Sequence, residues 1–197
     1  MYKKIFSIFL FLMVFSMAFA LAAEGDQGIA GVAFGSENGT RLQIQDGEHM
    51  GESGQMFKVQ TQANNRIMFE SEGVSAECDC EMVQEKSEGK TKLFVEMSNG
   101  QNSEVKIMPD AASEKALEKL KLNNCLEENS CQIELKEVGE GSEAKVAYEL
   151  KTQRQSKVLG IFKAQMQVSA QVSAETGEVL RVNKPWWAFL ASEPLEE

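Results

Sequence analysis

The sequence is poor in the residues from which most catalytic centres are built. It has a single histidine, His49, and no serine or cysteine nucleophile motif accompanies it. Histidine is the usual base that activates such nucleophiles. We therefore expect His49 to be a solvated residue of a glycine-rich acidic loop and the protein not to be an enzyme. The chain has no cofactor-binding motif either, so we expect no cofactor.

Basic residues are also scarce. Lys and Arg together number 20 against 30 Asp and Glu, which gives a formal net charge of −10. An acidic surface repels the phosphates of nucleic acids and keeps a chain soluble. The balance of charge therefore excludes DNA and RNA as expected partners.

Long apolar runs are absent except at the N-terminus, where residues 5–23 are almost wholly apolar. This run follows Lys3-Lys4 and ends with the small-x-small pattern Ala20-Leu21-Ala22, which is typical of a secretory signal peptide over residues 1–22. A retained anchor helix is the alternative, because the run approaches the length that spans a bilayer. Both alternatives predict an extracytoplasmic protein, either secreted or held at the cell envelope.

Cysteine is limited to four residues, Cys78, Cys80, Cys125 and Cys131. Exported chains meet oxidising conditions, so we predict a disulfide between Cys125 and Cys131, which enclose a short polar loop. Cys78 and Cys80 are expected to be buried thiols, because the strand pattern places both sulfurs on the apolar face. A strained disulfide between them is one alternative. As an alternative, these two sulfurs and nearby methionines could handle a soft ion such as Cu(I) or Zn(II). No second cysteine or histidine pair completes a four-ligand site, so no metal is expected.

Most of the chain alternates apolar and polar residues with a period of two, which is typical of half-buried strands. The clearest runs are 74–82 and 162–174, each of which places its apolar residues on one face. The turn Asn99-Gly100 between two such runs predicts a β-hairpin. Shorter strands are predicted around residues 42–44, 57–61, 67–69, 133–135, 146–150 and 180–182.

One helix is predicted, over residues 111–122, with Asp110 as its N-cap. The expected fold class is therefore mostly β with one helix. An N-terminal antiparallel β region covers residues 23–108, and an α+β region of one helix and an antiparallel sheet covers 109–184. An aromatic and then acidic tail, 185–197, ends the chain.

The last predicted hairpin reads Val172-Ser-Ala-Glu-Thr-Gly-Glu-Val-Leu180. It resembles the closing hairpin of PepSY modules, Val-Asp-Ala-x-Thr-Gly-Glu-Val, with Ser173 in place of the aspartate. The resemblance covers about residues 111–182 and implies a non-enzymatic envelope module that binds or inhibits peptidases. The chain also resembles a group of exported archaeal proteins without known activity, through the segments Lys106-Ile-Met-Pro-Asp110, Ile133-Glu-Leu-Lys-Glu-Val-Gly139 and Lys184-Pro-Trp-Trp-Ala-Phe-Leu-Ala191.

Residues 150–174 contain four basic residues and no acidic residue. The basic residues lie on both sides of the apolar stretch Val158-Leu-Gly-Ile-Phe162, which is expected near the end of a hairpin. An apolar hairpin tip beside cations suits a membrane surface or an acidic partner. Tryptophans in the tail favour the same surroundings. We therefore predict a non-catalytic binding module that meets an unknown envelope protein or the membrane surface. Its predicted contact surface contains Lys157, Leu159, Phe162, Trp186 and Trp187. The alternative places Leu159 and Phe162 in the core.

Overall fold

The computed structural model describes residues 34–36, 39–122, 131–159 and 161–192. The predicted signal or anchor segment, residues 1–22, lies outside these ranges, as do Cys125 and the last five residues. Within the described ranges, no helix has the length and apolar character needed to cross a membrane.

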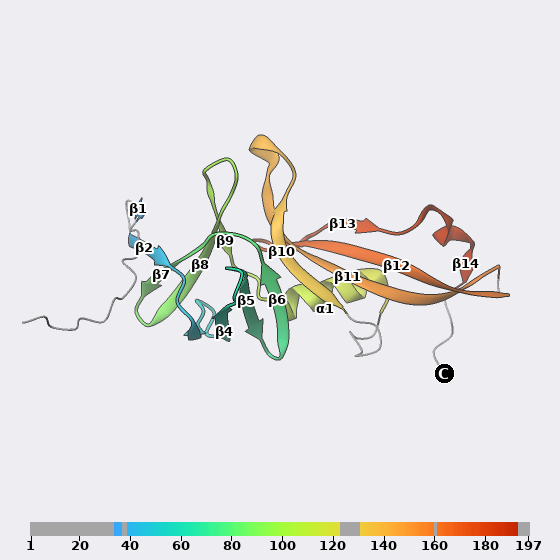
Figure 1. The fold of residues 1–197 in the computed structure, drawn as a ribbon, viewed down its shortest axis with the longest axis horizontal. Helices are drawn as coiled ribbons and strands as arrows, with labels where there is room; N and C mark the ends of the chain where they lie inside the picture. Colours follow the sequence, from blue (N-terminus) through green and yellow to red (C-terminus); the bar gives the residue numbers. More distant parts are fainter. Residues whose placement is uncertain (1–33, 37–38, 123–130, 160, 193–197) are drawn as a thin grey trace, which may run out of the picture. The chain divides into compact units, whose positions relative to one another are not determined.

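The strands form two sheets (Figure 1). The five-stranded sheet has the order β1 (Phe34–Ser36), β2 (Gly39–Gln43), β7 (Met82–Ser87), β8 (Lys90–Glu96) and β9 (Asn102–Val105). The nine-stranded sheet has the order β13 (Val179–Asn183), β12 (Phe162–Ser173), β11 (Lys145–Val158), β10 (Gln132–Val138), β6 (Val74–Cys78), β5 (Ile67–Ser71), β4 (Met56–Thr61) and β3 (Gly47–Met50), and its ninth strand β14 (Ala191–Ser192) pairs with β11.

The expected fold class, mostly β with a single helix and antiparallel sheets, is confirmed for the described part of the chain. The alternating runs became strands because each buries one face, as β12 does with Met166, Val168, Ala170 and Val172. The predicted hairpin is formed by β8 and β9, and Gly100 takes a φ of 77° in its turn. A positive φ favours glycine at this position.

The prediction of one strand over residues 74–82 is wrong. β6 ends at Cys78 in the nine-stranded sheet, and β7 begins at Met82 in the five-stranded sheet. The three residues between them carry the chain from one sheet to the other. The alternation continues across this crossover because the strands on both sides bury apolar residues in the same core.

The helix found within the described ranges, α1 (Pro109–Leu120), begins differently from the prediction. Asp110 is not the N-cap: Met108 occupies that position without a side-chain cap, and Pro109 is the first helical residue. Proline is well suited there, since it lacks the N–H that would have no partner in the first turn. The helix ends at Leu120, and Lys121 follows with a left-handed φ of 55°.

α1 packs against β5, β6, β11, β12 and β13, and its buried residues include Ala112, Ala116 and Leu120. A single core cluster combines these with residues from both sheets. The parallel pairing of β6 with β10 joins strands from the two predicted regions, 23–108 and 109–184. Both regions therefore share one sheet and one core.

Two smaller elements complete the described structure: the 3-10 turns η2 (Gly141–Glu143) and η3 (Trp186–Leu190). η2 lies between β10 and β11. η3 lies between β13 and β14, so the last strand follows directly from it.

Tyr148 shows how the core accommodates a polar group. Its side chain is fully buried, and its hydroxyl donates a hydrogen bond of 2.6 Å to the carbonyl oxygen of Ile107. We expect Tyr148→Phe to lower the free energy of unfolding by about 1–2 kcal/mol, because the Ile107 carbonyl then loses its partner. Urea denaturation of the two proteins measures this difference, and an equally stable variant would show that water replaces the hydroxyl.

Candidate functional site

The hairpin of β11 and β12, the longest among the described residues, extends beyond the strands that flank it. β10 pairs with β11 only as far as Lys151, and β13 pairs with β12 only as far as Ser169. Beyond these residues, β11 and β12 continue as a ribbon to the pair Val158 and Phe162. Sequence alternation places Phe162 on the inward face, but it is 64% exposed, because the ribbon runs past the end of the core.

The C-terminal segment returns to the end of this ribbon (Figure 1). β14 pairs with β11 through Val158 and Ala191, and the Leu159 N–H donates a hydrogen bond of 3.0 Å to the Leu190 carbonyl oxygen. This pairing brings η3 beside the hairpin end. Two segments far apart in sequence, residues 157–159 and 190–192, are therefore paired at the end of the hairpin.

Exposed apolar side chains gather at this place. Ten large apolar residues of the described structure are exposed, and six of them belong to the hairpin end and the returning segment. We call these six the tip surface: Leu159, Ile161, Phe162, Trp186, Phe189 and Leu190. Isolated exposed apolar residues are ordinary, whereas a contiguous group of them marks a contact site.

The predicted surface residues occupy different positions in this arrangement. Leu159 and Phe162 are exposed, so neither packs in the core. Trp186 is 81% exposed, whereas Trp187 is half-buried and packs against the core cluster. Lys157 is exposed and lies directly opposite Lys163 in the strand register. The structure adds three residues that the prediction did not include, Ile161, Phe189 and Leu190. Each is apolar and close in sequence to a predicted surface residue, so the sequence contained a signal that could have identified them.

Leu159 has an unusual backbone. Its φ is 52°, in the left-handed region that glycine and asparagine favour. A leucine in this region costs on the order of 1 kcal/mol, and such strained residues concentrate at functional positions. The fold therefore holds Leu159 at the tip in a strained backbone conformation.

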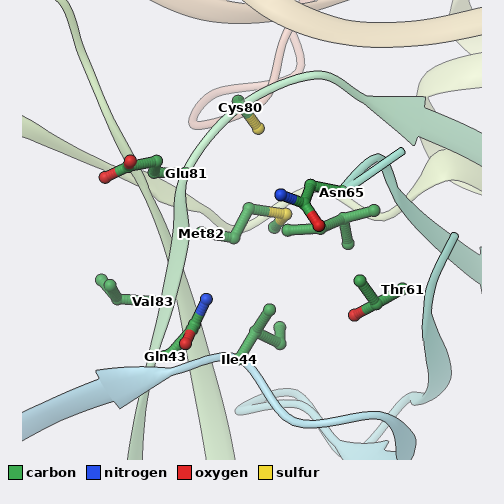
Figure 2. A pocket seen from close by; sticks show the side chains of 9 residues that line it. Gln43, Ile44, Thr61, Asn65, Cys80, Glu81, Met82 and Val83 are labelled. Carbon is green, nitrogen blue, oxygen red and sulfur yellow. The ribbon is translucent and has the colours of Figure 1, made fainter. Parts of the chain in front are cut away.

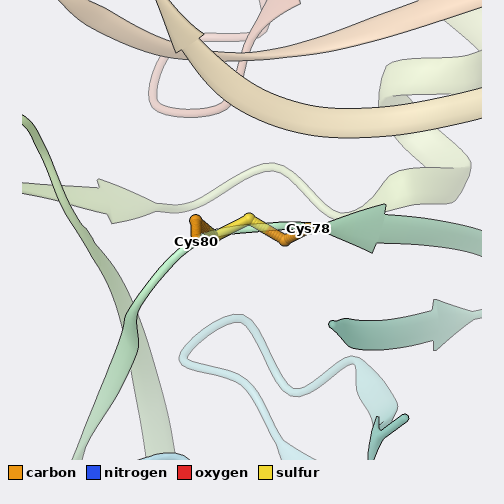
Figure 3. Close-up of a disulfide and its surroundings, with 2 residues drawn as sticks. All are labelled: Cys78 and Cys80. Carbon is orange, nitrogen blue, oxygen red and sulfur yellow. A yellow bond between two sulfur atoms is a disulfide. The ribbon is translucent and has the colours of Figure 1, made fainter. Parts of the chain in front are cut away.

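Cys78 and Cys80 are joined by a disulfide, so the prediction of two buried thiols is wrong (Figure 3). Their Cα atoms lie 5.3 Å apart, because β6 ends at Cys78 and the chain bends before β7. On the chain-entropy account, a disulfide that encloses one residue raises the free energy of unfolding by only about 1–2 kcal/mol.

The disulfide also bears on the soft-metal alternative. Both sulfurs are bonded to each other, so neither is a thiolate ligand. Among the described residues there is no group of three or more His, Cys, Asp and Glu side chains that could hold a metal ion. Cys131 is half-buried against the core and takes part in a disulfide. Cys125 lies outside the described residues, so the pairing of Cys131 with Cys125 stays a prediction.

A cavity of about 460 Å³ opens beside the disulfide (Figure 2). It lies between the two sheets and is lined by residues of both, and Cys80 forms one edge with its sulfur directed toward the cavity. The lining comprises Gln43, Ile44, Met82, Val83, Thr61, Asn65, Ile67, Cys80 and Glu81. Cys78 is fully buried and is not part of this lining.

His49 is not the solvated loop residue that the sequence predicts. It lies in β3, is 6% exposed, and stacks on Phe57 with ring centroids 5.3 Å apart. Its Nε2 donates a hydrogen bond of 2.8 Å to the Gln45 carbonyl oxygen. The prediction failed because glycines on both sides of His49 are typical of a loop, whereas this segment forms a short edge strand.

Ser173 stabilises the turn that carries the PepSY resemblance. Its hydroxyl oxygen accepts hydrogen bonds from the backbone N–H groups of Glu175 and Thr176, at 3.3 and 3.2 Å. An aspartate side chain can accept the same bonds. Comparison of the chain with protein-family models, curated proteins and solved structures finds no match. The resemblance to PepSY modules therefore stays a prediction.

Proposed function

We propose that the protein is a non-catalytic, exported binding module of the cell envelope, and that the tip surface is where it contacts a protein partner. The observation that carries this proposal is the gathering of six exposed apolar side chains at the hairpin end. Tryptophan and other aromatic residues dominate the energetic centres of protein interfaces, and three of the six are aromatic: Phe162, Trp186 and Phe189.

The charge of the chain favours a protein over a lipid surface. With a net charge of −10, the body of the molecule is repelled by an anionic bilayer. The tip itself is different, because Lys157 and Lys163 lie beside it and the ribbon has no acidic residue. A partner with an apolar pocket and an acidic rim matches this arrangement.

The tip surface is also held in place before binding. The pairing of β14 with β11 and the hydrogen bond from Leu159 to Leu190 fix the returning segment against the hairpin. A preformed surface loses less conformational entropy on binding than a flexible one, so a small apolar area supports a specific complex.

We expect Leu159→Asp to weaken partner binding at least about 100-fold, because an apolar contact is lost and a charge must be desolvated. The melting temperature should not fall, since Leu159 is exposed and aspartate tolerates a left-handed φ better than leucine does. A photo-crosslinking residue at position 162, exposed to envelope extract, gives the readout. The expected product is one discrete cross-linked protein, which Leu159→Asp removes.

Gln167→Asp is the matched control, because it introduces the same charge on the exposed face of β12 away from the tip. It should leave the cross-link intact. Sedimentation with phospholipid vesicles tests the other partner class. Binding to vesicles that Leu159→Asp abolishes, without a protein cross-link, would assign the tip surface to the membrane and contradict the proposal.

A further inference from the structure

The disulfide between Cys78 and Cys80 is not needed to hold its own segment. β6 pairs with β5 on one side and with β10 on the other, and β7 pairs with β2 and β8. Both ends of the crossover are therefore fixed by backbone hydrogen bonds. A cross-link that spans one residue between two anchored strands adds little constraint to the fold.

The two sulfurs differ in how an external reagent can reach them. Cys78 is fully buried in the core cluster, whereas Cys80 is half-buried and lines the open cavity (Figure 2). Thiol–disulfide exchange requires a thiolate to approach one sulfur, and access decides which sulfur is attacked. The cavity gives access to Cys80 alone.

From this asymmetry we infer that the Cys78–Cys80 disulfide is a thiol–disulfide exchange site that reacts in the folded protein, with Cys80 as the attacked sulfur and a dithiol as the co-reactant. A thiolate of the dithiol attacks the Cys80 sulfur, and the Cys78–Cys80 bond breaks as a mixed disulfide forms. Cys78 leaves as a thiolate and takes up a proton. This activity is separate from the tip surface and goes beyond the proposed binding function.

The second thiol of the co-reactant completes the exchange. As a thiolate, it attacks the first sulfur of the co-reactant, which is bonded to Cys80 in the mixed disulfide, and Cys80 leaves as a thiolate that is then protonated. Two electrons and two protons pass from the dithiol to the protein. The products are a disulfide in the co-reactant and a reduced Cys78–Cys80 pair, which remains in place because the flanking strands stay paired.

The charges around the site select the co-reactant. The segment reads Glu77-Cys78-Asp79-Cys80-Glu81, and both Asp79 and Glu81 are exposed. Glu77 is paired with Arg66 at 3.1 Å, so the carboxylates of Asp79 and Glu81 dominate the approach to Cys80. Anionic thiols are repelled by this field, and neutral or cationic thiols are not. The preferred co-reactant is therefore a dithiol without negative charge near its sulfurs.

The first test uses the oxidised full-length protein and dithiothreitol as the probe. Acid quenching, alkylation and peptide mapping follow the rate at which Cys78 and Cys80 become reduced under native conditions. We expect this rate to exceed the rate of global unfolding, measured by urea-jump fluorescence, at least tenfold. Reduction that proceeds only at the unfolding rate would overturn the inference, and this measurement needs no variant.

The second test compares the two sulfurs and the effect of charge. The Cys80 thiol in Cys78→Ser should react with 4,4′-dithiodipyridine at least tenfold faster than the Cys78 thiol in Cys80→Ser. At equal thiolate concentration, cysteamine should reduce the wild type several-fold faster than 3-mercaptopropionate, and the double variant Asp79→Asn, Glu81→Gln should remove this preference. Equal reactivity of the two thiols, or a charge preference that the double variant leaves unchanged, would contradict the inference.

Discussion

Phe69→Ala is expected to lower the free energy of unfolding by about 3–5 kcal/mol, the range for large-to-small changes of a buried aromatic residue. Phe69 is fully buried in β5, and its ring centroid lies 6.0 Å from that of Tyr148. The truncation leaves a cavity that the structure cannot close, because β4 and β6 hold β5 on both sides. The aromatic contact with Tyr148 is lost as well.

Urea denaturation followed by circular dichroism measures this loss. Met56→Ala is a suitable control, since Met56 lies on the neighbouring strand β4 but is exposed, and its truncation should change stability by less than about 0.5 kcal/mol. If Phe69→Ala cost no more than Met56→Ala, the core between β5 and β11 would be loosely packed.

The second large effect concerns Glu149, a buried carboxylate at the base of the long hairpin. Burial disfavours its charge, but hydrogen bonds from Lys136, Lys151 and Gln171 outweigh this cost and lower its pKa from 4.5 to about 2. Glu149→Gln removes the charge and leaves two lysines without their shared partner. We expect a loss of about 1–3 kcal/mol at pH 7.

The pH dependence of this loss has a definite sign. Because the pKa in the folded protein lies below the unfolded value, the ionised carboxylate stabilises the fold fully above about pH 4.5. The stabilisation declines as the pH falls toward 2. Urea denaturation at pH 7 and pH 2.5 should therefore show a gap between wild type and Glu149→Gln that narrows at the lower pH.

A control comes from an exposed ion pair. Glu77→Gln removes the carboxylate that pairs with Arg66, and both side chains are more than a third exposed. Such pairs contribute little to stability, so the loss should stay below about 1 kcal/mol. A Glu149→Gln gap of the same size at both pH values would show that packing around Glu149, and not its charge, determines the effect.

Much of the fold is predictable from the sequence, because a strand that buries one face alternates apolar and polar residues with a period of two. The runs around Phe57, Phe69, Leu135 and Val168 all became strands. The same periodicity says nothing about which sheet a strand joins, so the crossover between Cys78 and Met82 was hidden inside a continuous alternation. The disulfide was missed for this reason, since a regular strand would keep these two sulfurs apart.

The tip surface was only partly predictable. The apolar stretch around Leu159 and the adjacent tryptophans were visible in the sequence, and both suggested contact. Their proximity depends on β14, which contains only Ala191 and Ser192 and has no strand-like pattern. The separation of roles between Trp186 and Trp187 likewise arises from η3, which turns one indole to solvent and packs the other on the core.

The parallel pairing of β6 with β10 affects the order in which the chain assembles. β6 remains a sheet edge until α1 and β10 have emerged, so the pairing that completes the nine-stranded sheet waits for a segment far along the chain. Folding is slow when a long loop must close, because the entropy of the loop is lost before the stabilising contacts form. During that interval, the open edge of β6 can pair with another chain. Until β10 is available, the β6 edge is therefore a place at which the growing chain is open to strand pairing with other chains.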